Sequence, residues 1–168
     1  MFEYYEALGL QPKLRVDLDD LRKRFYARSR ESHPDLRGSE DRMAKLNDAF
    51  RTLRDPVTRA EYFLRENGIE LSKDAPPELL EEVFELNMAL EEIRAGDESA
   101  LPALKSSRER FAAMQSEVDG ELERLGAGYD VKPNPAALDE IRGALNRRRY
   151  ISNLLRDVDK ELNVHLSN

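Results

Sequence analysis

The sequence predicts an all-α protein made of two helical modules. Apolar residues recur at spacings of three and four along most of its 168 residues, and no stretch shows the strict alternation of a half-buried strand. Residues that end helices interrupt this pattern at intervals, as Gly, Asn-Gly or Asp-Pro. No apolar run approaches the roughly 18 residues that a membrane-spanning helix needs. The length fits one domain or two small ones.

The first module begins with two predicted helices. The first covers roughly residues 2–8 and ends at Gly9, a residue that favours helix ends. The second begins after Asp17, whose side chain can cap the first turn. It must end before Pro34, because the residue preceding a proline avoids helical backbone angles. Its predicted apolar face consists of Leu18, Leu21 and Phe25.

Two further helices complete this module. Ser39 is the predicted N-cap of the third, and Asp55-Pro56 ends that helix and starts the fourth. Asn67-Gly68 then ends the fourth helix. The third helix has apolar residues at spacings of three, four and three, namely Met43, Leu46, Phe50 and Leu53. We therefore expect a compact four-helix domain over residues 1–70.

Three longer helical patterns follow, over roughly residues 77–95, 99–125 and 135–164. Gly96-Asp97 separates the first two, and "GAGYDVKPNP" separates the last two. Short connections between amphipathic helices favour antiparallel packing. We therefore expect residues 71–168 to form an antiparallel three-helix bundle.

Charge and composition narrow the function. Residues 1–70 contain 14 of the 27 Lys/Arg and 14 of the 34 Asp/Glu, so the net charge of −7 arises in the other 98 residues. The charge of this acidic half disfavours nucleic-acid binding, since phosphate binding needs accumulated Lys and Arg. The chain has no cysteine, which excludes disulfides and thiolate-held metal centres. The start, "MFEYYEALGL", does not have the pattern of a signal peptide, and we expect a cytoplasmic protein without membrane contact.

His33-Pro34-Asp35, which follows a basic helix, is the most distinctive motif. A catalytic His–Asp pair is disfavoured, because adjacent loop residues rarely face each other and no nucleophile or Gly-rich phosphate loop accompanies them. A metal site is disfavoured too, since the only other histidine, His165, lies near the far end of the sequence. We therefore expect no catalytic residue, no metal ligand, no cofactor and no enzyme activity.

The surroundings of this motif resemble the J-domain over residues 2–66. The matching segments are "YYEALGL", "LRKRFYARSRESHPD" and "AKLNDAFRTLRDPVTRAEYF". The resemblance implies that the chain stimulates ATP hydrolysis by a DnaK/HscA-class chaperone, through His33-Pro34-Asp35 and the cations Arg22, Lys23 and Arg24. Proline stiffens such a loop, and a basic helix steers a protein towards an acidic partner.

Two positions depart from the J-domain pattern. Arg28 stands where J-domains usually have an apolar residue, and Ser32 stands where they usually have an aromatic one. Arg28 follows Phe25 by three residues, so we expect it near the apolar face, with its methylene stem covering that face and its guanidinium in water. The end of this helix should then be less firmly packed.

The first helix of the predicted bundle has two apolar rows where a surface helix needs one. The inner row is Leu79, Val83, Leu86, Leu90 and Ile93. The outer row, about 100° away, is Leu80, Phe84 and Met88. Two neighbouring helices could cover both rows and make a wide core face. Alternatively, the outer row is a partner-binding surface with an acidic rim.

A J-domain followed by a compact acidic bundle resembles the HscB family of iron–sulfur cluster co-chaperones. Within the bundle, "FELNMALEEI" resembles the segment by which that family binds the cluster scaffold, IscU. The resemblance implies scaffold contacts at Leu80, Phe84, Glu85 and Tyr150, and the outer row adds Met88. Asn87 and Met88 stand where some members carry charged residues.

Other interpretations remain open at this stage. The chain could be a J-domain co-chaperone for a different client. It could instead be a helix-turn-helix DNA-binding protein, with residues 39–53 as its recognition helix, but Glu40, Asp41 and Asp48 would repel phosphates. A purely structural adaptor would leave His33-Pro34-Asp35 unexplained.

Overall fold

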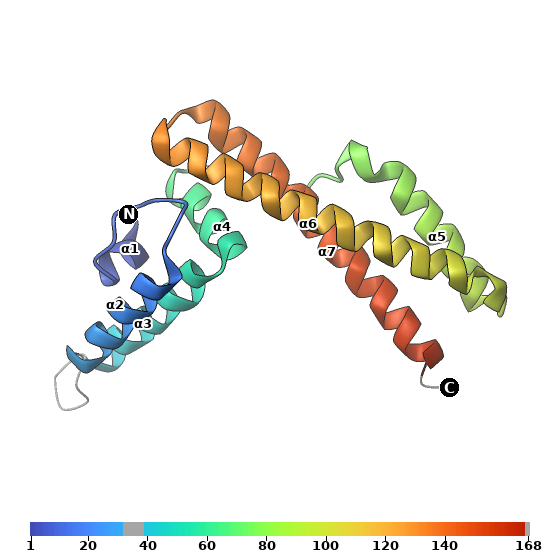
Figure 1. Ribbon diagram of the computed structural model, residues 1–168, viewed down its shortest axis with the longest axis horizontal. Coiled ribbons are helices and arrows are strands. Elements are labelled where there is room, and N and C mark those ends of the chain that lie inside the picture. Colours follow the sequence, from blue (N-terminus) through green and yellow to red (C-terminus); the bar gives the residue numbers. More distant parts are fainter. Residues whose placement is uncertain (32–38, 167–168) are drawn as a thin grey trace. The chain divides into compact units, whose positions relative to one another are not determined.

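The computed structural model describes residues 1–31 and 39–166, and every regular element in these ranges is a helix (Figure 1). The all-α prediction is confirmed. The helices are α1 (Glu3–Ala7), α2 (Leu18–Glu31), α3 (Ser39–Arg54), α4 (Pro56–Glu66), η1 (Pro77–Leu79), α5 (Leu80–Arg94), η2 (Glu98–Ala100), α6 (Leu101–Val131) and α7 (Pro135–Leu166).

Contacts within the chain define two compact units. The first comprises Met1–Leu71 and Glu123–Arg142, and the second comprises Ser72–Leu122 and Gly143–Asn168. The long helices α6 and α7 therefore contribute to both units. The boundary that the sequence predicts between two modules, after residue 70, stays a prediction.

Local capping signals set the helix starts in the first unit. The carboxylate of Asp17 accepts hydrogen bonds from the backbone N–H groups of Asp19 and Asp20, at 2.9 and 3.2 Å. Asp55 caps α4 in the same way, accepting from Val57 at 2.7 Å and Thr58 at 3.3 Å. These bonds satisfy N–H groups that the first turn leaves unpaired. Both predicted helix starts are confirmed.

Tyr5 and Arg59 hold the core of the first unit together. Tyr5 is fully buried, and its hydroxyl donates to the carbonyl of Lys13 at 2.6 Å. The buried guanidinium of Arg59 donates to the carbonyls of Leu14 and Leu53, at 2.7 and 2.6 Å. Burial lowers the pKa of Arg59, an effect that Tyr5 and nearby carboxylates oppose. One side chain of α4 thus ties down both the loop before α2 and the end of α3.

Burial of Tyr5 should make the protein less stable at alkaline pH. Burial raises the pKa of this phenol well above its ordinary value of about 10, although the nearby Arg59 lowers it. The unfolded chain therefore loses the Tyr5 proton first, so the stability is complete below about pH 10 and falls as the pH rises further. We expect the urea midpoint to fall above pH 10, and less steeply for Tyr5→Phe. Equal slopes for the two proteins would contradict this.

The helix α6 continues further than the sequence predicts. The segment 126–131 was expected to lie in the loop before α7, but it is the last part of α6. Each glycine within a helix costs about 1 kcal/mol relative to alanine, and tertiary contacts offset this cost. The carboxylate of Asp130 accepts from the backbone N–H groups of Leu14 and Arg15, both at 2.9 Å. A Cβ on Gly126 would lie only 3.2 Å from that of Leu14, so glycine permits this close approach.

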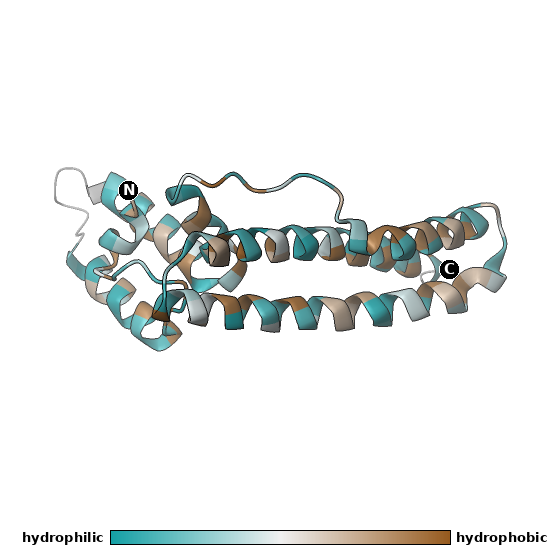
Figure 2. Cartoon of the chain, turned by 90° about the horizontal axis from the view of Figure 1, so that it is seen from above, coloured by the Kyte–Doolittle hydropathy of each residue, from teal (hydrophilic) through white to brown (hydrophobic). Residues whose placement is uncertain are grey.

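The second unit is a three-helix bundle, formed by α5 and the adjoining parts of α6 and α7. Apolar and polar residues alternate in patches along these helices (Figure 2), as expected for helices that are buried on one side. Buried side chains from all three helices form its core, among them Leu86, Leu90 and Ile93 of α5, Leu104, Phe111 and Val118 of α6, and Ile151, Val158 and Leu162 of α7.

Candidate functional site

The predicted chaperone-binding residues are only partly covered by the structure. His33, Pro34 and Asp35 lie outside the described residues, so their predicted role stays a prediction. The helix that precedes them, α2, is described up to Glu31. It presents the three cations that the sequence singles out, and they have different surroundings.

Arg22 and Lys23 are exposed, whereas Arg24 forms hydrogen bonds within the first unit. The closest partner of Arg22 is Asp19, with an N···O distance of 3.5 Å. Lys23 has no ion pair or hydrogen bond among the described residues. Arg24 donates to the carboxylate of Asp20 at 2.8 Å and to the carbonyl of Gly9 at 2.6 Å. Arg24 therefore fastens the end of α1 to α2, and Arg22 and Lys23 are the cations free to meet a partner.

Arg28 lies over the end of α1. It is exposed, and its guanidinium lies so close to Gly9 that a Cβ there would be 2.7 Å from Arg28 Nη2. Together with Ala7 and Leu46, Arg28 lines a cavity of about 310 Å³. The apolar contact of α2 is made instead by Phe25, whose ring stacks on Phe50 with centroids 4.5 Å apart. Glycine at position 9 leaves room for the arginine that replaces the usual apolar residue.

The outer row of α5 is exposed in the bundle. Leu80, Phe84 and Met88 have 60%, 65% and 48% of their surface exposed, whereas Leu86 of the inner row is 1% exposed. The second unit therefore covers one apolar row and leaves the other uncovered. Of the two alternatives left open by the sequence, a wide core face is excluded. An exposed row of three large apolar side chains is typical of a binding surface.

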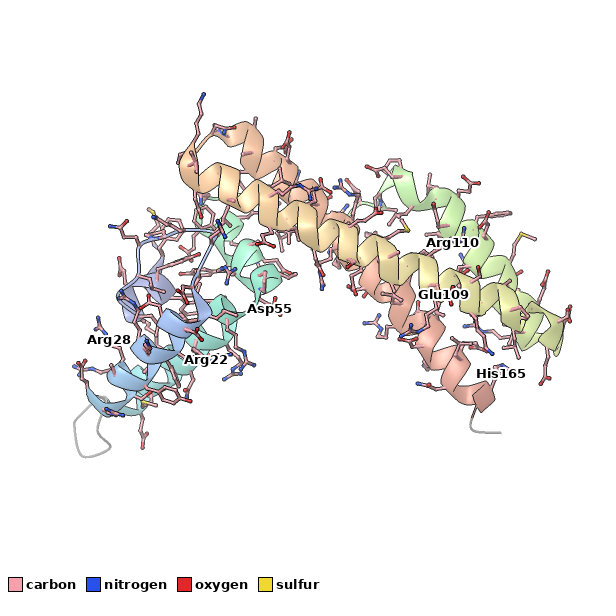
Figure 3. The ribbon with its side chains drawn as sticks, viewed as in Figure 1. Arg22, Arg28, Asp55, Glu109, Arg110 and His165 are labelled. Carbon is pink, nitrogen blue, oxygen red and sulfur yellow. The ribbon has the colours of Figure 1, made fainter. Side chains whose placement is uncertain are left out.

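Glu85 lies at one flank of the outer row. Its carboxylate is 3.0 Å from the guanidinium of Arg110, which projects from α6 (Figure 3). Both side chains are about half exposed, and such pairs contribute little to stability, roughly 0–1 kcal/mol. Glu81 and Glu92 are exposed along the same helix. The outer row thus has an acidic rim, with one carboxylate already paired to a cation.

Tyr150 is held in place by contacts with two neighbouring groups. Its ring is half-buried, and its hydroxyl donates to the carbonyl of Lys73 at 3.0 Å. The guanidinium of Arg149 lies over the ring, 5.3 Å from its centroid. The phenol therefore fixes the segment before η1 to α7, and only part of the ring can meet a partner.

Sequence reasoning missed Arg110 and Arg149 as neighbours of this surface. Arg110 is 25 residues from Glu85 in sequence, and the two meet because α5 and α6 pack side by side. Helical spacing relates residues within one helix but not residues of different helices. One sequence feature pointed weakly to Arg149, namely that it adjoins Tyr150 within "RRRY".

Residues 1–31 and 39–166 contain no cluster of three or more His, Cys, Asp or Glu side chains that could hold a metal ion. Within the same ranges, no helix combines the length and the apolar character needed to cross a membrane.

Comparison with known proteins identifies both halves of the chain. Residues 3–62 match the family model for the DnaJ domain, so the chain is a J-domain co-chaperone. Residues 75–159, about half of the chain, match the model described as the HSCB C-terminal oligomerisation domain. The chain belongs to the HscB family, the J-domain co-chaperones of iron–sulfur cluster assembly. Its J-domain implies an Hsp70-class chaperone as partner.

The individual relatives match between 69% and 97% of this chain. The co-chaperone protein HscB homolog of Vibrio vulnificus is 32% identical, over 69% of this chain and 80% of that protein. The homolog of Neisseria meningitidis is 28% identical, over 96% of this chain and all of that protein. The structure of chaperone HscB from Vibrio cholerae superposes with a TM-score of 0.67 at 28% identity, covering 97% of this chain and 98% of that one. Human co-chaperone protein HscB gives a TM-score of 0.68 at 25% identity, over 94% and 81%.

Proposed function

We propose that this protein binds an IscU-like iron–sulfur scaffold through its C-terminal bundle and stimulates ATP hydrolysis by a DnaK/HscA-class chaperone through its J-domain. The exposure of the outer row, Leu80, Phe84 and Met88, is the observation that carries this proposal. The same chain combines an uncovered apolar surface, suited to holding a protein, with a domain that engages a chaperone. Such a chain delivers its bound protein to the chaperone.

The apolar row and its acidic rim have different tasks in scaffold binding. Burying large apolar side chains supplies most of the affinity, because a few central anchors usually dominate an interface. The carboxylates around them set register and exclude partners with an acidic surface. The chain itself has no cysteine with which to ligate a cluster. The cluster stays on the scaffold, and the co-chaperone holds the scaffold protein.

The J-domain acts on the chaperone without chemistry of its own. Nucleotide binding and hydrolysis take place in the chaperone, so the protein is not an enzyme. The exposed cations Arg22 and Lys23 guide the J-domain to an acidic chaperone surface. His33-Pro34-Asp35 then makes the contact that triggers hydrolysis, and hydrolysis is coupled to release of the cluster. We place this activity in the cytoplasm.

A chaperone ATPase assay with purified proteins tests the proposal. The co-chaperone should raise the ATPase rate of a DnaK/HscA-class chaperone, and adding the scaffold should raise the rate further. Calorimetry should show direct binding between the scaffold and the co-chaperone. Stimulation without any scaffold binding would mean that the bundle serves a different client.

Reversing the charge of Arg22 and Lys23 should slow association with the chaperone. We expect Arg22→Glu with Lys23→Glu to lower the association rate constant, and rising salt should lower that of the wild type, because steering by exposed charges is screened. Stopped-flow fluorescence measures both effects. Lys105→Glu with Lys132→Glu changes the net charge equally at exposed sites that are not part of α2 and is the matched control. Salt-independent association of the wild type would rule out steering.

A further inference from the structure

The J-domain has a pocket whose role is not explained by the trigger motif. It lies where the start of α2 meets the end of α3 and the start of α4, and it has a volume of about 300 Å³. Arg22 and Asp55, both labelled in Figure 3, lie on its rim. Its lining residues are Leu18, Leu21, Arg22, Phe50, Arg54, Asp55 and Pro56.

The floor of this pocket is apolar and partly uncovered. Leu21 is fully buried, and Phe50 is half-buried against Phe25. Leu18 was predicted to share the packed face of α2, but it is 43% exposed. It occupies the first position of α2 and lines the pocket. Covering this apolar surface would be favourable, at about 25 cal/mol for each Å² removed from water.

The rim of the pocket is cationic. Arg54 is exposed, has no ion pair among the described residues, and places its guanidinium 5.7 Å from the centre of the Phe50 ring. Within the described part of the chain, Arg22 has only the 3.5 Å contact with Asp19. Asp55 also lines the pocket, and its Oδ1 accepts from two N–H groups at the start of α4. Two guanidinium groups are therefore available beside an apolar floor.

We propose that this pocket is a second docking point for the partner chaperone. An aliphatic side chain of the chaperone enters above Leu18, Leu21 and Phe50, and a neighbouring carboxylate binds between Arg22 and Arg54. Guanidinium groups suit this task because they bind carboxylates through two parallel hydrogen bonds and stack on aromatic rings. This inference rests on the proposed function of the J-domain.

Position and charge favour the chaperone as the occupant. Arg22 belongs both to the pocket and to the cationic face of α2, so the two surfaces are continuous. The 14 residues of α2 span about 21 Å, and the pocket lies at the opposite end of this helix from the segment that leads to His33. A chaperone that contacts both ends of α2 would hold the J-domain in one orientation. The trigger motif alone would leave it free to rotate.

An ATPase titration with matched arginine variants tests this docking point. Arg54→Gln should raise the co-chaperone concentration needed for half-maximal stimulation by about tenfold, the change expected for loss of one charged hydrogen-bonded contact. The maximal stimulation should stay unchanged, because the trigger motif is intact. Arg51→Gln is the control, since Arg51 is also an exposed arginine of α3 but lies outside the pocket. Arg54→Lys should have an intermediate effect on this concentration, because lysine keeps the positive charge but cannot form two parallel hydrogen bonds with a carboxylate. Equal titrations for Arg54→Gln and Arg51→Gln would overturn the proposal.

Site-specific crosslinking gives a second and independent readout. The chain has no cysteine, so Leu18→Cys labelled with benzophenone maleimide carries a single photoreactive group at the pocket. We expect an adduct with the chaperone, formed at a segment that contains an acidic residue and weakened by Arg54→Gln. The same label on Arg51→Cys should give little adduct. Equal adducts from both sites, or none from Leu18→Cys, would refute the docking point.

The docking point and the proposed function can be refuted separately. If wild-type protein stimulates the chaperone and Arg54→Gln behaves as wild type, the docking point is wrong and the proposed function stands. If wild-type protein neither binds nor stimulates any DnaK/HscA-class chaperone, both are wrong.

Discussion

Replacing His33 with glutamine should reduce stimulation of the chaperone ATPase to the basal rate. The resemblance to J-domains implies that His33-Pro34-Asp35 makes the trigger contact. Glutamine keeps a polar side chain of similar size but cannot reproduce the imidazole contact. Helical content and scaffold binding should be unchanged, because this motif stands between α2 and α3 in the sequence and is not part of the bundle that we propose for the scaffold. An ATPase titration, circular dichroism and calorimetry measure the three properties.

The second histidine provides the matched control for this variant. His165 lies in α7, where its Nε2 is 3.6 Å from a carboxylate oxygen of Glu161. His165→Gln makes the same chemical change in the bundle and should stimulate as well as wild type. Normal stimulation by His33→Gln would show that this chain does not use the J-domain mechanism.

Local signals explain why so much of the fold could be predicted. The Asp17 and Asp55 caps, and the turns at Gly9 and Gly68, depend on a few neighbouring residues. Such interactions can be read from the sequence because both partners lie within one turn of each other. The inner row of α5 was predictable for a similar reason, since its spacing follows from helical geometry alone.

Contacts between distant segments account for what the sequence could not show. The extension of α6 to Val131 depends on the bonds from Asp130 to the backbone of Leu14 and Arg15, more than 100 residues away. Local propensity favoured a loop there because of two glycines, and tertiary packing overrode it. Helical spacing likewise could not predict the pairing of Arg110 with Glu85, because the two residues lie on different helices. For the candidate site, the sequence identified the exposed apolar row but not the cation beside it.

The arginines of the J-domain show how one residue type divides into structural and binding roles. Arg24 and Arg59 donate to backbone carbonyls and join separate segments of the domain. Among the described residues, Arg22 has one 3.5 Å ion-pair contact and Arg54 has none, and both line the pocket at the start of α2. All four are equally cationic in the sequence. Only their surroundings separate those that hold the fold from those available to a partner.

Removing the outer row of α5 should abolish scaffold binding without unfolding the protein. Because Leu80, Phe84 and Met88 are largely exposed, replacing each with alanine should change the free energy of unfolding by within about 0.5 kcal/mol. Apolar anchors at the centre of an interface cost about 2 kcal/mol or more each when truncated. The triple variant should therefore lose scaffold binding in calorimetry. Its J-domain should still stimulate the chaperone, but the scaffold should no longer increase that stimulation.

Two further variants separate binding from packing on these helices. Leu86→Ala removes a buried leucine from the inner row of the same helix, and it should cost roughly 2–5 kcal/mol of stability. Tyr150→Phe removes only the bond to the Lys73 carbonyl, and it should keep scaffold binding if the ring is what the scaffold contacts. Thermal melts followed by circular dichroism distinguish these cases. If the outer-row triple variant melted as early as Leu86→Ala, those side chains would belong to the core. If it stayed folded and still bound the scaffold, the binding surface would lie elsewhere on the protein.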